Sequence, residues 1–347
     1  MITYRKLTQR PGMFRNLCGL SQEEFDALCR EWVYADAVGR ATATHRREGQ
    51  QPRRRAPGAG RKYVLDAPTR LLAALVWLKL YPTWPVLGFL FGVEESAVRR
   101  STQDVLRRLE AMAVFPLEQR TPGSPASPAS GAGSQERPRE HPREHPQEPA
   151  PKRPRGRSLA EVVQDEPVLQ MLIDSREQRI RRPKGWQAQK PFDSGKKKAH
   201  TLKCQAAVSL DCRVQALSPS VPGSTRDLTL LRQSGVLTVL EPTEGVGADK
   251  GYVGIEQLHP EAACYVPHKK PPGGELTEEE KSYNRLLSAV RIVVEHLFAR
   301  MSRFGALSQL FRHRREQHST VVRGGAFLAD RQIAAGQAAA AAAPAAA

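Results

Sequence analysis

The sequence predicts an α/β domain with a mixed sheet, preceded by a separate all-α domain. Residues 63–112 carry apolar side chains at helical spacing, whereas strand-like and helical runs alternate over residues 163–330. Residues 116–157, between these regions, consist mostly of Pro, Ser, Gly, Glu and Arg. These three observations indicate two folded parts joined by a linker.

The predicted boundaries follow the changes in composition. Residues 116–160 hold too few apolar side chains to offset the entropy of ordering, which predicts a disordered linker. A shorter break, Gly49–Lys62, contains arginines that could contact phosphate or could only keep a linker solvated. The Ala-rich end could be a short frayed helix or disordered. The predicted divisions are an N-terminal helical segment (1–48), an all-α domain (63–115), a linker (116–160), an α/β domain (163–325) and a low-complexity tail (331–347).

The chain is strongly basic, which favours a polyanionic partner. Lys and Arg number 53 against 36 Asp and Glu, so the formal net charge is +17. Nucleic acid is the commonest partner of such a chain, and a basic protein without one is the alternative. Aromatic residues make up only 6% of the sequence, which disfavours a general RNA-binding protein that stacks bases on aromatic rings.

The cysteines and the apolar runs disfavour several other classes. Five cysteines without paired short spacings argue against a disulfide framework and a four-cysteine zinc site. The N-terminus lacks the apolar run of a signal peptide. The longest apolar run, Leu71–Leu80, is too short to cross a bilayer, so no membrane partner is expected.

Residues 83–112 predict a helix-turn-helix. In "TWPVLGFLFG", Thr83 is a candidate N-cap and Gly92 ends a short helix. The next helix has one apolar face, formed by Val98, Val105, Leu106 and Leu109. In this motif the second helix enters the major groove, led by its N-terminal residues. A plain helical hairpin with exposed arginines is the alternative. The candidate DNA-contacting residues are Ser96, Arg99, Arg100 and Gln103.

The α/β domain is predicted from its strand-like runs and two helices. Strands are expected at 167–174, 200–210 and 213–220, the last two joined by a tight turn at Asp211 and Cys212. "STRDLTLLRQSG" predicts a helix that Gly235 ends, while "GVGADKGYVG" and "ACYVPHKKP" predict short strands. "SAVRIVVEHLFARMSRF" predicts a helix with one apolar face, formed by Val290, Val294, Leu297, Met301 and Phe304.

Four acids in this domain are candidates for phosphodiester chemistry. Asp174 ends the first predicted strand, Asp227 follows "PGST", Asp249 lies in "ADKGY" and Glu295 is on the last helix. Phosphodiester hydrolysis or transfer is commonly served by two divalent ions. Mg²⁺ and Mn²⁺ prefer carboxylate oxygens, and acids from two strand ends and a helix could hold them.

Each of these acids also has a structural interpretation. Asp174 and Asp249 could be ordinary turn residues. Asp227 stands three residues after Ser224, a spacing that favours a helix-capping role over metal binding. Glu295 could pair with Arg291 one turn earlier, which contributes only about 0.3–0.5 kcal/mol at an exposed position. Periodicity alone does not choose between the two sets of interpretations.

A series of motifs does favour one of them. In order, these are "YPTWPVLGFLFGVEESAVRR", "IDSREQRI", "SGKKKAHTLK", "SPSVPGSTRDLTLL", "ADKGYVG" and "KKPPGGELTEEEKSYNRLLSAVRIVVEH". From Gly60 to about Arg315 the chain thus resembles DDE-type transposases of the insertion-sequence and Harbinger-like group, a DDE superfamily endonuclease with an N-terminal helix-turn-helix. The resemblance implies a ribonuclease-H-like nuclease fold.

The resemblance also implies an activity. The catalytic acids would be Asp174, Asp249 and Glu295, binding two Mg²⁺ (or Mn²⁺) ions, with Asp227 as an accessory metal position. The implied reaction is cleavage at the ends of a transposon, followed by strand transfer by the freed 3′-hydroxyl. The partner would be double-stranded DNA, in the element's terminal repeats and in the target, bound by a homodimer or a larger assembly. The expected location is with the DNA, in a bacterial cytoplasm and nucleoid or a eukaryotic nucleus.

Basic residues of the nuclease part would then lie along the DNA backbone, where their contacts make binding sensitive to salt. For each of them a solvated basic surface is the alternative. Lys269, Lys270 and the run Arg312–His318 are further candidates. The main candidates are Lys196, Lys197, Lys198, His200, Lys250, Arg300 and Arg303.

The sequence departs from the family pattern in four places. Ser175 and Arg176 stand where many members have a small residue and a threonine, and a bulky Arg176 could crowd the site. Ala248 stands where many have glycine, and the Pro-rich insert and Ala-rich end are atypical. These departures suggest the alternative of a decayed or domesticated copy that binds DNA without cleaving it.

Overall fold

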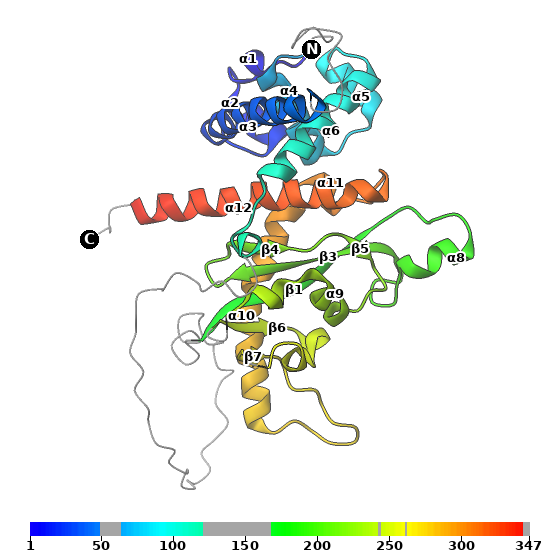
Figure 1. Cartoon of the computed structure of the whole chain (residues 1–347), viewed down its shortest axis with the longest axis vertical. Coiled ribbons are helices and arrows are strands. Elements are labelled where there is room, and N and C mark those ends of the chain that lie inside the picture. The colour runs from blue at the N-terminus through cyan, green and yellow to red at the C-terminus, as the bar shows by residue number, and fades with distance from the viewer. Residues whose placement is uncertain (49–63, 121–167, 242–243, 261, 343–347) are drawn as a thin grey trace.

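The computed structural model describes residues 1–48, 64–120, 168–241, 244–260 and 262–342 (Figure 1). The predicted break at Gly49–Lys62 lies wholly outside these residues, as does the predicted linker from residue 121 onward. A helical part precedes a mixed sheet with flanking helices, as the sequence predicts. Within the described part of the chain, no helix combines the length and the apolar character needed to cross a membrane.

The helical part is assembled around one buried helix. Helix α4 (Ala67–Leu80) begins at Asp66, whose side chain accepts from the Thr69 amide, and nearly every residue from Thr69 to Leu78 is buried. Tyr81 ends it in a left-handed conformation just before Pro82. Three helices pack with it, namely α1 (Tyr4–Leu7), α2 (Pro11–Cys18) and α3 (Gln22–Glu48).

Two helices joined by a tight turn lie where the helix-turn-helix is predicted. Helix α5 (Trp84–Phe91) ends at Gly92, which has φ 65°, and α6 (Glu95–Met112) follows. The turn is tight, because a Cβ atom on Gly88 would lie only 2.7 Å from the Val93 carbonyl oxygen. The predicted apolar face of α6 is buried, at Val98, Val105, Leu106 and Leu109.

Regular structure continues beyond residue 115, where the helical domain is predicted to end. Residues Pro116–Gln119 form a 3₁₀ turn, η1, in which Leu117 is buried. Glu118 of this turn accepts hydrogen bonds from Arg323 and from the amide of Leu217. Arg120 forms an ion pair with Glu244 at 2.6 Å. The first residues of the predicted linker therefore pack against the sheet.

The sheet has a long central strand with one antiparallel and one parallel neighbour. Strand β1 (Leu169–Arg179) pairs antiparallel with β3 (Ala199–Ser209) and parallel with β6 (Gly245–Ala248). The order is β2-β3-β1-β6-β7, with β4 and β5 also paired to β3. The shorter strands are β2 (Asp193–Ser194), β4 (Val214–Leu217), β5 (Val221–Pro222) and β7 (Cys264–Tyr265).

Helices cover both faces of this sheet (Figure 1). Helix α10 (Glu278–Ser302) buries the predicted face of Val290, Val294, Leu297 and Met301 in one apolar cluster with Leu172 of β1. Helix α9 (Asp227–Ser234) buries Leu231 in a second cluster with Ile173 of β1. Alternate residues of β1 thus face α10 and α9. The remaining short elements are α8 (Trp186–Gln189), η2 (Lys190–Phe192), η3 (Val236–Val239), η4 (Lys250–Tyr252), η5 (Ile255–Gln257) and η6 (Arg315–Gln317).

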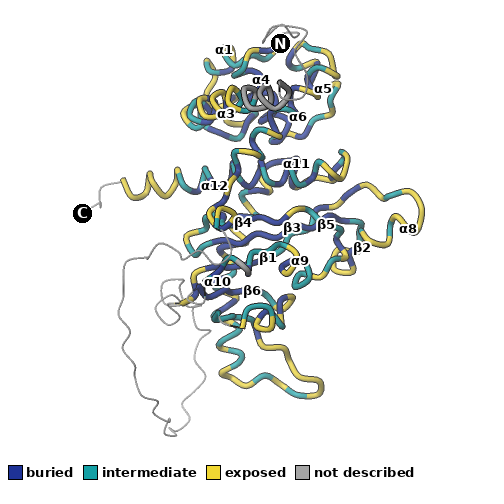
Figure 2. The backbone as a smooth tube through the Cα atoms, viewed as in Figure 1, coloured by how far each residue is buried: buried dark blue, intermediate teal, exposed yellow. Residues whose placement is uncertain are grey.

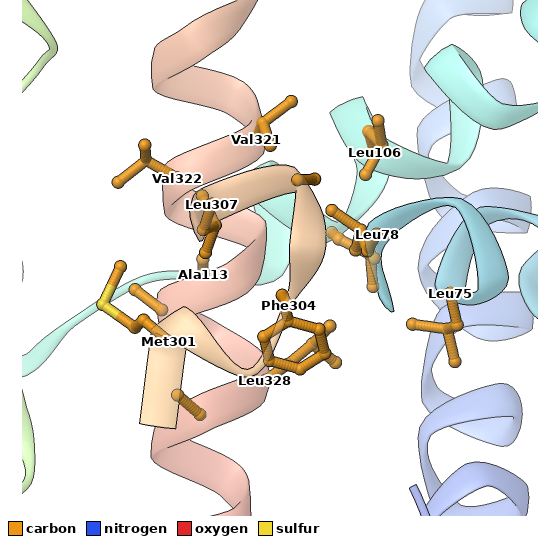
Figure 3. Packing of buried hydrophobic residues seen from close by; sticks show 14 of the residues in the cluster. Leu75, Leu78, Leu106, Ala113, Met301, Phe304, Leu307, Val321, Val322 and Leu328 are labelled. Carbon is orange, nitrogen blue, oxygen red and sulfur yellow. The ribbon is translucent and has the colours of Figure 1, made fainter. Parts of the chain in front are cut away.

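One apolar core joins the helical part to the sheet part. After α10, the short helix α11 (Gly305–Ser308) and the long helix α12 (His318–Ala342) return to the helical part. Leu78 of α4 lies with Phe304, Leu307 and Leu328 in this core (Figure 3). The buried backbone runs continuously between the two parts (Figure 2). The two predicted domains therefore pack as one body.

The predicted C-terminal tail begins as an ordered helix. Residues 331–342 continue α12, and the last residues, 343–347, lie outside the described part. Arg331 forms an ion pair with Glu31 at 2.6 Å, and Gln332 donates to the Gly19 carbonyl at 2.8 Å. Ile333 is buried. These contacts dock the beginning of the Ala-rich segment on the N-terminal helices.

Candidate active site

Asp174 and Asp249 are brought together by the register of two parallel strands. Ile173 of β1 pairs with Ala248, the last residue of β6, and the residue that follows each of them in the chain is an aspartate. The pKa of Asp174 is raised, first by burial and then by the negative charge of Asp249, while the Ser175 amide and the charge of Arg291 act in the opposite direction. The sequence prediction that Asp174 ends its strand is wrong, because β1 continues to Arg179.

Asp227 approaches Asp249 across a glycine. The Gly251 amide donates to Oδ1 of Asp249 at 2.7 Å. A Cβ atom on Gly251 would lie 2.8 Å from Oδ2 of Asp227 and 2.9 Å from Oδ1 of Asp249. Any larger residue at position 251 would therefore force these carboxylates to move. Three aspartates from β1, α9 and the end of β6 therefore converge at one edge of the sheet.

Buried Tyr252 confirms that these three carboxylates share one neighbourhood. Its hydroxyl accepts a hydrogen bond from Nε2 of Gln205 at 2.6 Å. Its pKa is raised by burial first, and also by the negative charges of Asp227, Asp174 and Asp249. The phenol therefore stays protonated beside the acid cluster.

Asp227 does not have the predicted capping role. The N-cap of α9 is Arg226, and the hydroxyl of Ser224 donates instead to the Pro191 carbonyl at 2.6 Å. Oδ1 of Asp227 accepts from Ser175 Oγ at 2.7 Å and from Lys203 Nζ at 2.8 Å. The capping prediction failed because two side chains from neighbouring strands engage this carboxylate.

Glu295 lies on α10 and is linked to Asp174 through an arginine. Its side chain is 61% exposed, and Oε1 lies 4.0 Å from Nη2 of Arg291. The same Nη2 atom lies 3.5 Å from Oδ2 of Asp174. The predicted Arg291–Glu295 pair is therefore present at the limit of an ion pair. Both carboxylates border the same guanidinium group.

These side chains fit a hard divalent cation at the Asp174–Asp249 pair. Carboxylate oxygens are the donors that Mg²⁺ and Mn²⁺ prefer, and the repulsion that raises the pKa of Asp174 is one that a cation relieves. The side chains are not yet arranged as a complete metal site. Among the residues that the structure describes, no group of three His, Cys, Asp or Glu side chains is close enough together to hold a metal ion. Arg291 instead provides the positive charge between Asp174 and Glu295.

Sequence reasoning missed the polar residues that support the acids. Lys203 and Gln205 lie in the predicted strand 200–210, and both are buried. Lys203 also lies 3.6 Å from Glu177, so it neutralises carboxylates on β1 and α9 together. The available signal was a lysine and a glutamine within an otherwise apolar strand, which indicates buried polar partners.

The predicted DNA-contacting residues form separate groups. Lys196, Lys197 and Lys198 are exposed in the turn between β2 and β3, and the charge of Lys196 opposes the rise that burial causes in the pKa of Asp174. His200 is half-buried on β3, while Lys250 is exposed directly after Asp249. On α6, at the helix-turn-helix, Ser96, Arg99 and Arg100 are exposed and Gln103 is half-buried.

The two predicted arginines near the end of α10 lie in different places. Arg303 is exposed, and its carbonyl accepts from Lys79 Nζ at 3.0 Å. Arg300 is half-buried, and its charge opposes the rise that burial causes in the pKa of Cys212, so it lies beside the turn between β3 and β4. Lys269 and Lys270 are exposed in the loop that precedes α10.

Half of the basic run at Arg312–His318 has a structural role that the sequence did not reveal. Arg312 bonds the Tyr81 carbonyl, and the ring of His313 lies 5.1 Å from those of Trp77 and Trp84. His318 is buried. Burial therefore removes His318 from the predicted DNA surface and His313 is half-buried against the two tryptophans, whereas Arg314 and Arg315 stay exposed.

The unusual residues beside the acids do not crowd them. The Nη2 atom of Arg176 donates to the Leu307 carbonyl at 2.6 Å, which directs the guanidinium toward α11. Ser175 supports Asp227. Ala248 is buried in the α9-side cluster. The departures at these three positions are accommodated by the local packing.

Comparison with known proteins agrees with this geometry. Residues 173–330 match the family described as DDE superfamily endonuclease, a segment that contains all four acids. The probable transposase for insertion sequence element IS702 of Microchaete diplosiphon is 27% identical over 310 residues, which cover 89% of this chain and 90% of that protein. No solved structure gives a significant match. The resemblance of this chain to DDE-type transposases is therefore confirmed, and residues 173–330 are the segment that matches the DDE superfamily endonuclease family.

Proposed function

We propose that this protein is a transposase that binds the ends of a DNA element, cleaves a strand and transfers the freed 3′-hydroxyl to target DNA. The observation that carries the proposal is the register of β1 and β6, which sets Asp174 beside Asp249 at a sheet edge covered by α10. Glu295 on α10 borders the same arginine as Asp174. Double-stranded DNA is the proposed substrate, bound by a homo-oligomer in the compartment that holds the DNA.

In the proposed mechanism, Asp174, Asp249 and Glu295 would hold two Mg²⁺ or Mn²⁺ ions. Such ions activate the attacking oxygen and stabilise the leaving oxygen of a phosphodiester. Asp227, whose Oδ1 atom is held by Ser175 and Lys203, is the accessory metal position, and its Oδ2 atom faces Gly251 on the Asp249 side of the site.

Two exposed lysines flank the proposed reaction site. Lys196 lies close enough to Asp174 for its charge to oppose the rise that burial causes in the pKa of Asp174, and Lys250 follows Asp249 directly. Both would hold phosphates of the DNA backbone beside the acids, without reading the base sequence. In the same proposal, Arg99 and Arg100 of α6 bind the element end through the major groove.

The proposed nuclease fold is ribonuclease-H-like. The long central strand β1 lies between antiparallel β3 and parallel β6, and it carries an acid at its middle. The second acid follows β6, and a helix packed on β1 carries the third. This arrangement supports the fold that the motif series implies.

A DNA-binding protein without nuclease activity is the second candidate. The position of Arg291 favours it, because the guanidinium lies between two of the three proposed catalytic carboxylates. If Arg291 does not move, it excludes cations by charge. The helix-turn-helix residues would still bind DNA in such a protein.

Nicking of a supercoiled plasmid that bears the element's ends distinguishes the two candidates. With Mg²⁺ or Mn²⁺, the wild type is expected to nick, and Asp174→Asn, Asp249→Asn and Glu295→Gln to fall to background. Glu279→Gln is the matched control, because Glu279 is an exposed acid on the same helix as Glu295. If the wild type nicks no better than the three variants, the enzyme proposal fails, and retained binding to the ends supports the second candidate.

A further inference from the structure

A pocket opens beside the proposed reaction site. It has a volume of 320 Å³ and lies between β1, the turn after β2 and the last turns of α10. Ser175, the residue after Asp174, forms part of its wall, so the pocket adjoins the acid cluster. This volume is at the small end of ligand pockets, which suits a single nucleotide and not a duplex. The residues that define its character are Ser175, Arg176, Lys196, Lys197, Phe298 and Ala299.

Arg176 supplies an uncompensated positive charge to this pocket. Its Nη2 atom donates to the Leu307 carbonyl, but its buried Nη1 atom has no hydrogen-bond partner. Among the described residues, no carboxylate forms an ion pair with it. A buried donor without a partner is costly, so a ligand that accepts from Nη1 after a shift of the Arg176 side chain would be stabilised.

The pocket combines this charge with an aromatic surface. The Cζ atom of Arg176 lies 5.9 Å from the centroid of the Phe298 ring. Lys196 and Lys197 are exposed where the pocket meets solvent. The acid of the lining, Glu177, accepts from Thr201 Oγ1 at 2.7 Å and lies 3.6 Å from Lys203 Nζ. The surface offered to a ligand is therefore cationic and aromatic.

We propose that this pocket binds one unpaired nucleotide of a DNA strand beside the acid cluster. The base would stack on Phe298 and accept from Nη1 of Arg176, while Lys196 and Lys197 would hold its phosphate. Stacking on an aromatic ring together with lysine contacts to phosphate is the usual chemistry of single-strand recognition. This inference rests on the proposed function and names the form of DNA end that the site takes.

The test measures binding to two duplexes that differ by one nucleotide. One duplex carries a single unpaired 2-aminopurine at its 3′ end, and the other is blunt with 2-aminopurine in the last pair. Binding of the full chain is followed by the fluorescence anisotropy of the duplex. EDTA is present so that no cleavage occurs. The wild type is expected to prefer the overhang duplex by about tenfold, with quenching of the 2-aminopurine fluorescence.

Filling the pocket should remove this preference. Ala299 is exposed on α10, so Ala299→Trp blocks the pocket without disturbing the core. Ile292→Trp is the matched control, since Ile292 is 50% exposed on the same helix and outside the pocket lining. The proposal expects Ala299→Trp to bind both duplexes equally and Ile292→Trp to behave as the wild type. An overhang preference retained by Ala299→Trp overturns it.

Two further arms separate this proposal from its neighbours. Free dAMP in excess is expected not to displace the overhang duplex. If dAMP displaced it at concentrations similar to that of the duplex, the proposal that the pocket binds a DNA end would be overturned in favour of a free nucleotide. Overhang preference without nicking in Mg²⁺ would support the pocket and contradict the proposed function. Nicking by a wild type with no overhang preference would support the function and overturn the pocket.

Discussion

The Nη2 atom of Arg291 lies 3.5 Å from Oδ2 of Asp174 and 4.0 Å from Oε1 of Glu295. Arg291 and Glu295 are one helical turn apart on α10, whereas Asp174 is on the central strand. One guanidinium therefore links the helix to the sheet at the acid cluster. Its charge also opposes the effect of burial and of Asp249 on the pKa of Asp174.

Replacing Arg291 should make the protein less stable in the absence of metal and should increase the stabilisation that a bound metal ion provides. Arg291→Gln leaves Asp174 and Asp249 without this cation, at an expected cost of about 1 kcal/mol in the free energy of unfolding. The melting temperature in EDTA should fall by about 2–4 °C, and Mn²⁺ should raise it by more than it raises that of the wild type. Arg285→Gln, an exposed change on the same helix, is the control. An unchanged melting temperature in EDTA would contradict a role for Arg291 at the acid cluster.

The exposed arginines at the start of α6 should contribute to DNA affinity. Arg99→Ala and Arg100→Ala each remove a positive charge at the end of the helix that would enter the major groove. Each substitution should weaken binding to element ends and lower the slope of log affinity against log salt by about 1. Arg107→Ala is the matched control, because Arg107 lies farther along α6 and pairs with Asp104. If Arg99→Ala, Arg100→Ala and Arg107→Ala weaken DNA binding equally, α6 acts only as a basic surface and its first residues have no special role.

The helices were largely predictable because their signals are local. Gly92 and Gly235 end α5 and α9 in left-handed conformations, as glycines at these positions predict. The apolar face of α10 was visible as a 3.6-residue period, although the helix ends at Ser302 and Phe304 lies beyond it. Capping and periodicity depend only on neighbours in sequence, so one sequence suffices to reveal them.

The length of β1 was not predictable, because its second half is polar. Ser175 donates a hydrogen bond to Asp227, and Gln178 donates to the carbonyls of Ala306 and Gln309. These partners are 52 to 131 residues away in the sequence. A polar run can be a strand only when such partners exist, and the sequence does not display them. The same holds for the contact of Arg291 with Asp174, whereas the Arg291–Glu295 pair follows from helical spacing.

Asp330 should be a major support of the packing of α12 on the sheet. Its carboxylate accepts from Arg213 Nε at 2.9 Å, from Arg213 Nη2 at 2.7 Å and from the Val214 amide at 2.8 Å. Asp330→Ala leaves the buried amide without a partner, so the free energy of unfolding should fall by about 2–3 kcal/mol. Urea denaturation measures this change.

The matched control is a more exposed ion pair of the same helix. Glu31 pairs with Arg331, and its side chain is 48% exposed. Glu31→Ala should therefore cost less than about 1 kcal/mol, because solvent screens the pair. Equal losses in the two variants would mean that the contacts of Asp330 contribute no more than a surface pair.

His318 should make the protein less stable in mild acid. Its Nε2–H donates to Oε1 of Gln178 at 3.1 Å, and Nδ1 lies 2.7 Å from Oγ of Ser220, which donates to it. Burial, and then the charge of Arg176, lower the pKa of His318 from 6.5 to about 3. The folded state therefore keeps the ring neutral at a pH where the unfolded chain binds a proton.

The sign of the pH effect follows from this difference. Above pH 6.5 the ring is neutral in both states, and as the pH falls below 6.5 only the unfolded state gains a proton, so stability is lost progressively down to about pH 3. Between pH 7 and pH 5, His318 should cost the wild type about 2 kcal/mol. His318→Gln cannot titrate, so its stability deficit at pH 7 should shrink by that amount at pH 5. Thermal unfolding of both proteins across this range measures the difference, and a deficit that does not change with pH would show that His318 is protonated alike in the folded and unfolded states.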